Sequence, residues 1–179
     1  MPLMSVPFKL PAPYPLPAGL TQTLQAQPVD QNVEAIMHML IEEGMADVAL
    51  LEVLEGDALR VMAVQARRPE PFWPLVGVTE ASSDRFSAKA LEAGTSLLPM
   101  GDLDPAEAGL RPAFVDAFLA GRPQADLGFA YVLPLIGEGG TRHGVLTLVR
   151  GEGPLNHDQP AIVQAFGQWL AHRFDQSAQ

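Results

Sequence analysis

The sequence predicts an α+β domain built on an antiparallel sheet. Two amphipathic helical stretches lie toward the two ends of the chain, and two pairs of strand-like segments lie between them. Each pair is joined by a short turn, which connects antiparallel neighbours, and one face of such a sheet can bury the apolar stripes of both helices. Residues 67–126, here called the excursion, separate the two pairs and contain only short regular segments.

The composition is typical of a globular domain and excludes several kinds of site. The formal net charge of −10 opposes contact with a phosphate backbone, so we expect no nucleic acid partner. No apolar run approaches the roughly 18 residues of a membrane span, and we expect a cytoplasmic protein without a membrane partner. The chain has no cysteine, which excludes disulfides, thiolate metal sites and a cysteine nucleophile.

The first helix is expected to begin at Asp30, a residue type favoured at helix N-caps, and to stop at Gly44. The apolar residues between them recur at intervals of three and four, which places them on one face of a helix. These residues are Val33, Ile36, Met37, Leu40 and Ile41.

Four longer segments are expected to form the two hairpins. Residues 48–54 and 59–66 are joined by an acidic turn that contains Gly56. Residues 128–135 and 143–149 are joined by a glycine-rich turn. Such runs of apolar and β-branched residues around short glycine turns are typical of antiparallel pairs.

The excursion is expected to hold two short helices and one brief strand. Its opening, residues 67–74, contains three prolines and is predicted to accept no regular element. A helix begins near Ser83 and ends before Gly94, and residues 97–98 form the strand. Pro112 suits the start of the second helix.

The last helix is expected to begin after Asn156 or Asp158, either of which suits an N-cap. The polar tail from Asp175 is expected to fray. The inward face of this helix follows helical spacing and consists of Ile162, Phe166, Trp169 and Leu170.

We therefore predict one domain over residues 29–175, followed by a polar tail at 176–179. Seven prolines fall at or before Pro28, so residues 1–28 are expected to form an extended, proline-rich arm. The arm could dock on a partner or on the domain itself, or it could be a partly ordered leader.

Three stretches, taken in order with the helices and hairpins, resemble a GAF domain over about residues 30–174. Residues 93–103 read AGTSLLPMGDL and resemble the family's aGrpvvvpDl segment. Residues 131–135 and 144–148 read YVLPL and GVLTL and resemble two of its strands. Residues 154–158 read PLNHD and resemble the loop before its last helix.

The resemblance implies that both terminal helices cover one face of the sheet and that the excursion covers the other. In GAF domains, small ligands bind between the sheet and the excursion. The sequence departs from the versions of this family whose activity is known, because the cyclic-nucleotide signature is absent. The chromophore-binding versions and the free-methionine-sulfoxide reductases need cysteine, which this chain lacks.

The candidate ligand-binding residues are aromatic and polar side chains of the excursion, together with one tyrosine in a strand. The aromatic residues could equally fix the excursion to the sheet, and the tyrosine could be an ordinary sheet residue. Asp102 also suits an acidic helix start, and Arg111 an exposed surface. The candidates are Phe72, Trp73, Phe86, Asp102, Arg111, Phe114, Phe118 and Tyr131.

No catalytic or metal-binding constellation emerges from the sequence. The four histidines show no metal-ligand spacing, and no set of nucleophile, base and orienting group can be assembled. We therefore expect a non-catalytic sensory or regulatory module that binds a small molecule, of a class that the sequence does not name, and signals in trans to a separate output protein. The alternative is a protein-interaction and dimerisation scaffold without a ligand.

A homodimer is also expected, from the resemblance and from apolar positions left over after the helix stripes were assigned. These positions are Met39, Met45 and Val163.

Overall fold

The fold is described from a computed structural model. It describes residues 29–80, 86–94, 97–100, 112–120, 129–151, 155 and 159–177. The predicted arm, the proposed caps Asn156 and Asp158, and the candidates Asp102 and Arg111 lie outside these residues.

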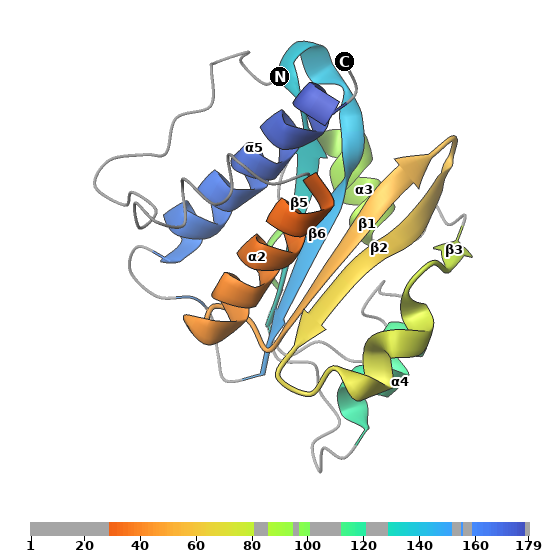
Figure 1. The fold of residues 1–179 in the computed structure, drawn as a ribbon, viewed down its shortest axis with the longest axis vertical. Helices are drawn as coiled ribbons and strands as arrows, with labels where there is room; N and C mark the ends of the chain where they lie inside the picture. Colours follow the sequence, from red (N-terminus) through yellow and green to blue (C-terminus); the bar gives the residue numbers. More distant parts are fainter. Residues whose placement is uncertain are drawn as a thin grey trace.

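A single sheet of six strands, which differ in length, forms the centre of the fold (Figure 1). Its strand order is β3-β2-β1-β6-β5-β4, and each neighbouring pair is antiparallel, as predicted. Both predicted hairpins are present, and each strand of them extends beyond its predicted bounds at one end or both. The strands are β1 (Val48–Glu55), β2 (Ala58–Ala66), β3 (Thr79–Glu80), β4 (Leu97–Met100), β5 (Phe129–Ile136) and β6 (Arg142–Arg150).

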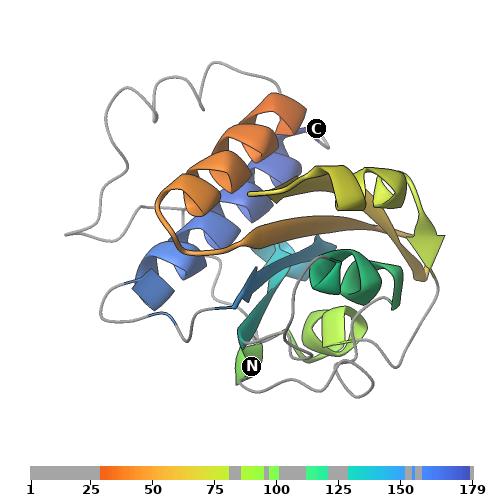
Figure 2. The ribbon, with the colours of Figure 1, turned by 90° about the horizontal axis from the view of Figure 1, so that it is seen from below.

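The two terminal helices lie side by side on one face of the sheet, as Figure 2 shows. They are α2 (Val29–Glu42) and α5 (Gln159–Ser177). Their apolar stripes meet alternate residues of the central strands in one cluster, here called the helix-side cluster. Its fully buried members include Met37 and Leu40 of α2, Leu146 and Leu148 of β6, and Leu170 of α5.

The excursion covers the opposite face. Its helices α3 (Phe86–Ala93) and α4 (Pro112–Leu119) lie across the sheet from α2 and α5 (Figure 2). The layer arrangement predicted for the α+β fold is therefore confirmed. Because side chains alternate along a strand, the residues between those of the helix-side cluster face the excursion.

Two details of the excursion differ from the sequence-based predictions. Its opening, expected to be irregular, contains a 3₁₀ helix, η1 (Glu70–Leu75), because prolines suit the first turn of a helix, where no amide donor is needed. The two-residue strand β3 was not predicted, because two residues give no periodicity to detect.

The ends of the terminal helices also differ from the predictions. Helix α2 begins at Val29, so Asp30 lies in its first turn rather than at its cap. Helix α5 continues to Ser177, so the prediction that the chain frays from Asp175 was wrong. The Asp175 carboxylate accepts a hydrogen bond from the Glu138 amide at 2.8 Å and bonds His143 Nε2 at 2.6 Å, which holds the last turns of the helix in place.

Two of the three positions offered as a dimer surface are buried within the chain. Met45 and Val163 both belong to the helix-side cluster, and Met39 packs against it half-buried. The dimer itself stays a prediction. Within the described residues, no helix is long and apolar enough to cross a membrane.

Candidate functional site

The apolar residues that face the excursion form two separate clusters. The first, here called the η1–α4 cluster, joins Phe72 and Leu75 of η1 to α4 and to one end of the sheet. The second, here called the α3 cluster, joins Ala90 and Leu91 of α3 to Leu59 and to β5 and β6. The helix side of the sheet has one apolar cluster, whereas the excursion side has two. The apolar surface on the excursion side is therefore interrupted between its two clusters.

Buried polar side chains lie on this face beside both clusters. Glu52 of β1 is 3% exposed and Ser87 of α3 is 4% exposed. The Ser87 hydroxyl donates a hydrogen bond of 2.7 Å to Glu52 Oε1. Glu52 is paired with Val61 of the η1–α4 cluster on one side and with Val145 of the α3 cluster on the other. The carboxylate therefore marks a boundary between the two clusters.

Thr147 lies at the same boundary, in the middle of β6. It is paired with Leu50 of the η1–α4 cluster on one side and with Val132 of the α3 cluster on the other. Its side chain is 0% exposed, and its hydroxyl has no hydrogen-bond partner in the part of the chain that the structure describes. Buried hydroxyls normally have a partner, and leaving one without costs about 1–3 kcal/mol.

Glu52, Ser87 and Thr147 are together called the polar strip. Its two strand members come from β1 and β6, which are paired directly. Gly144, in the stretch that resembles the GAF family, allows this close pairing because a Cβ there would collide with the Glu52 carbonyl oxygen. Sequence reasoning missed the strip. The available signal was a single polar residue at a core-facing position in each of two apolar strands.

A hollow of about 250 Å³ opens at the end of the sheet where β1 begins and β2 ends. Asp47 is held in its wall, since its carboxylate accepts a hydrogen bond of 2.8 Å from the Gly151 amide and lies 3.4 Å from Arg67 Nε. The Arg67 side chain is 56% exposed, and Arg68 next to it is also exposed. The lining residues are Asp47, Val48, Ala66, Arg67, Arg68, Pro71, Phe72, Ala117, Phe118 and Ala120.

The structure brings three of the predicted ligand-binding residues together. Phe72 and Phe114 have ring centroids 5.5 Å apart, and Phe118 joins them in the η1–α4 cluster. Phe72 and Phe118 also line the hollow. These three side chains are buried, so the aromatic residues of the excursion serve its core as well as the hollow.

The remaining candidates lie apart from that group. Trp73 is 62% exposed, and Tyr131 is in the helix-side cluster, on the opposite face of the sheet. There the Tyr131 hydroxyl accepts a hydrogen bond of 2.6 Å from the Leu155 amide. Phe86 is the first residue of α3, and its side chain is outside the described part of the structure.

Comparison with known proteins identifies the fold. No family model and no curated protein matches the chain. Solved GAF domains from several proteins do match its structure, over most of its length. The chain has a GAF fold. The predicted resemblance is therefore confirmed at the level of the fold.

Three of the solved structures that are similar to this chain come from two kinds of protein. The GAF domains of phosphoenolpyruvate-protein phosphotransferases from Coxiella burnetii and Acinetobacter have TM-scores of 0.66 and 0.69, with 19% and 12% identity. Each alignment covers 89% of this chain and 90% of the other. The free methionine-R-sulfoxide reductase of Neisseria meningitidis, in complex with its substrate, has a TM-score of 0.63 and 16% identity over 89% and 86% of the two chains.

Proposed function

We propose that this GAF domain is a non-catalytic sensory or regulatory module that binds a small molecule between the sheet and the excursion. The observation that carries the proposal is the Thr147 hydroxyl, which is fully buried and without a partner among the described residues. A ligand that hydrogen bonds to this hydroxyl would remove the cost of burying it unpaired. The GAF fold of the chain supports the location.

The polar strip favours a ligand that is neutral or cationic and carries N–H donors. The Ser87 hydroxyl already donates its proton to Glu52, so its remaining capacity is to accept a hydrogen bond. Glu52 already accepts a hydrogen bond from Ser87 and offers further acceptor oxygens, which disfavours an anionic group, since such a group brings only acceptors. The apolar clusters on either side suit a ligand with a flat or aliphatic body.

The sheet itself connects this site to the terminal helices. Thr147 faces the excursion, while its neighbours Leu146 and Leu148 pack in the helix-side cluster with α2 and α5. A ligand that shifts β6 would therefore shift the surface on which both helices rest, provided that it binds one arrangement better than the other. We propose that the signal leaves through the α2–α5 pair, in trans, to an output protein.

The proposal assigns no catalysis to the site. The chain contains no cysteine, so the cysteine chemistry that the family's free-methionine-sulfoxide reductases use is impossible here. Among the described residues, no three histidine, aspartate or glutamate side chains are arranged to hold a metal ion. The strip offers one carboxylate and two hydroxyls, which can bind and orient a ligand.

A thermal-shift screen tests the proposal. The panel compares nucleosides, free amino acids and polyamines with phosphate and nitrate, each at saturating concentration. A ligand present at 100 times its Kd stabilises the folded state by about 2.7 kcal/mol, which raises the melting temperature measurably. We expect at least one neutral or cationic compound to do this.

The matched variants are Thr147→Val and Thr141→Val, which make the same chemical change at a buried and at an exposed position. We expect the shift to disappear in Thr147→Val and to persist in Thr141→Val. If no compound stabilises the wild type, or if Thr147→Val responds as the wild type does, the proposal fails.

The alternative is a ligand-free scaffold. It is favoured by the way Phe72, Phe114 and Phe118 fill the η1–α4 cluster with the protein's own side chains. In that case the panel gives no shift. The chain would instead act through an interaction surface.

A further inference from the structure

The exposed large hydrophobic side chains of the described residues all lie in one short segment. They are Trp73 at 62% exposure, Val76 at 49% and Val78 at 44%. Single exposed apolar residues are common, but three within six residues concentrate exposed apolar side chains in one short segment, which is typical of an interaction site. Residues 73–78 are here called the apolar segment.

The apolar segment is held firmly in place. On its inner side, Phe72 and Leu75 are buried in the η1–α4 cluster. Its backbone is fixed to β2, since the Val61 amide donates to the Val78 carbonyl at 3.0 Å and the Gly77 amide donates to the Val61 carbonyl at 2.8 Å. The exposed side chains are therefore presented on a preorganised support, which lowers the entropic cost of binding.

The hollow and the apolar segment share helix η1. Pro71 and Phe72 line the hollow, and Trp73 follows them in the chain. A volume of about 250 Å³ lies below the roughly 300–1,000 Å³ of pockets for drug-sized ligands, so the hollow suits a single inserted side chain better than a whole ligand. Its apolar lining, which includes Val48, Phe72 and Phe118, suits an aromatic or aliphatic side chain.

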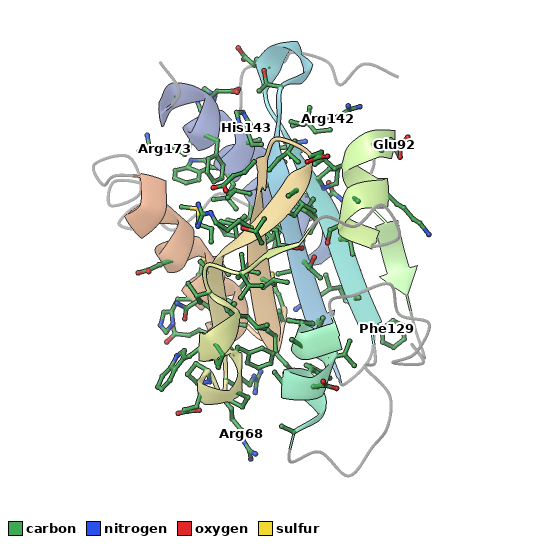
Figure 3. All side chains as sticks on the ribbon, turned by 90° about the vertical axis from the view of Figure 1, so that its right-hand side faces the viewer. Arg68, Glu92, Phe129, Arg142, His143 and Arg173 are labelled. Carbon is green, nitrogen blue, oxygen red and sulfur yellow. The ribbon has the colours of Figure 1, made fainter. Side chains whose placement is uncertain are left out.

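Two arginines stand at the rim of the hollow, in a chain whose net charge is −10. Arg67 lies 3.4 Å from Asp47, so Arg68 is the rim arginine whose charge is available to a partner. Figure 3 shows Arg68 at the opposite end of the molecule from Arg142 and His143. Arginine and tryptophan are the residue types most enriched at the energetic centres of protein interfaces.

We propose that the hollow and the apolar segment form a docking surface for a segment of a partner protein. That segment inserts one aromatic or large aliphatic side chain into the hollow, and a flanking carboxylate meets Arg68. Trp73, Val76 and Val78 cover its apolar face. This surface does not include Glu52, Ser87 or Thr147, so it does not depend on ligand binding at the polar strip.

Selection of random twelve-residue peptides on the full chain tests the proposal. We expect the enriched peptides to share an aromatic or large aliphatic residue flanked by Asp or Glu. Enrichment of basic peptides, or of peptides without such an anchor, would overturn the proposal, and so would a selection that enriches nothing.

Fluorescence anisotropy of the most enriched peptide then measures its affinity for variants. We expect Trp73→Ala and Arg68→Glu each to weaken binding about tenfold or more, which corresponds to about 1.4 kcal/mol. Arg142→Glu is the matched control, since Arg142 is an exposed arginine at the far end of the molecule, and it should bind as the wild type does. Circular dichroism shows that each variant is folded.

Three outcomes would contradict the docking surface. The peptide could bind both variants as tightly as it binds the wild type. Acrylamide could fail to quench the fluorescence lost in Trp73→Ala, which would mean that the rest of the chain covers this tryptophan. Sedimentation could show a dimer that Trp73→Ala converts to a monomer, which would assign the surface to a second copy. Thr147→Val should leave peptide affinity unchanged, so the result is independent of the proposed ligand.

Discussion

The two faces of the sheet are built differently. On the helix side, α2 and α5 meet the strands in one continuous apolar cluster, and the buried Tyr131 hydroxyl has a partner. On the excursion side, two clusters are separated by Glu52, Ser87 and Thr147, and the Thr147 hydroxyl has no partner among the described residues. The helix side thus resembles a core optimised for stability. The excursion side retains a buried hydroxyl that has no partner among the described residues and therefore costs stability, and the proposed ligand would pair it.

The two faces of the sheet also differ at the ends of their helices and strands. At the β5–β6 turn, Asp175 of α5 bonds both His143 and the Glu138 amide, and the His143 ring stacks on Phe174 with centroids 5.6 Å apart. Gly137 makes room for this contact, since a Cβ there would collide with the Asp175 carboxylate. The helix side is therefore closed at its end by specific polar contacts. The excursion side ends in the open hollow.

The largest expected effect is on the helix side. Phe166 is 1% exposed in the helix-side cluster, and Phe166→Ala leaves a cavity there. We expect a loss of about 3–5 kcal/mol in the free energy of unfolding, measured by urea denaturation. Gln168→Ala, at an exposed position of the same helix, is the control and should change little. A loss below about 1 kcal/mol for Phe166→Ala would mean that this side is not the main core.

The contact at the end of α5 is expected to have the next largest effect. Asp175→Ala removes two hydrogen bonds and leaves the half-buried His143 ring without its carboxylate. We expect a loss of about 1–3 kcal/mol in the free energy of unfolding. Gln176→Ala, in the same turn but exposed, should be close to neutral. Equal stability of Asp175→Ala and the wild type would restore the prediction of a frayed tail.

A smaller effect is expected from Tyr131→Phe. The substitution keeps the ring in the helix-side cluster and removes only the hydroxyl that accepts a hydrogen bond from the Leu155 amide. The buried amide then loses its partner, and we expect a cost of about 1 kcal/mol in the free energy of unfolding. A neutral or stabilising result would show that this hydroxyl is not needed on the helix side.

The sequence was sufficient to predict the helices and strands whose apolar residues repeat with a clear period. The helical stripe around Met37 and Leu40 and the two hairpins follow from spacing alone. The role of Asp175 does not follow from spacing, because its partners His143 and Glu138 are 32 and 37 residues away in the chain. Arg68 and Trp73 are close in the sequence, but their exposure and the neighbouring hollow can be seen only in three dimensions.

The polar strip shows the same limit at the candidate site. Glu52 and Thr147 are polar residues at core-facing positions of two apolar strands, and their diagonal placement across the strand pair depends on the register of β1 and β6. Ser87 reaches Glu52 from a helix 35 residues further along the chain. The aromatic residues of the excursion stay predicted ligand-binding candidates, and three of them pack in the η1–α4 cluster.

The stability and ligand response of Thr147→Val test the central claim most directly. Valine has nearly the shape of threonine and lacks the hydroxyl that is buried without a partner among the described residues. We expect the ligand-free variant to be more stable than the wild type by about 1 kcal/mol, opposite in sign to Tyr131→Phe, and to lose the response to any compound that stabilises the wild type. A Thr147→Val protein that is less stable than the wild type, or that still responds to the compound, would contradict the account.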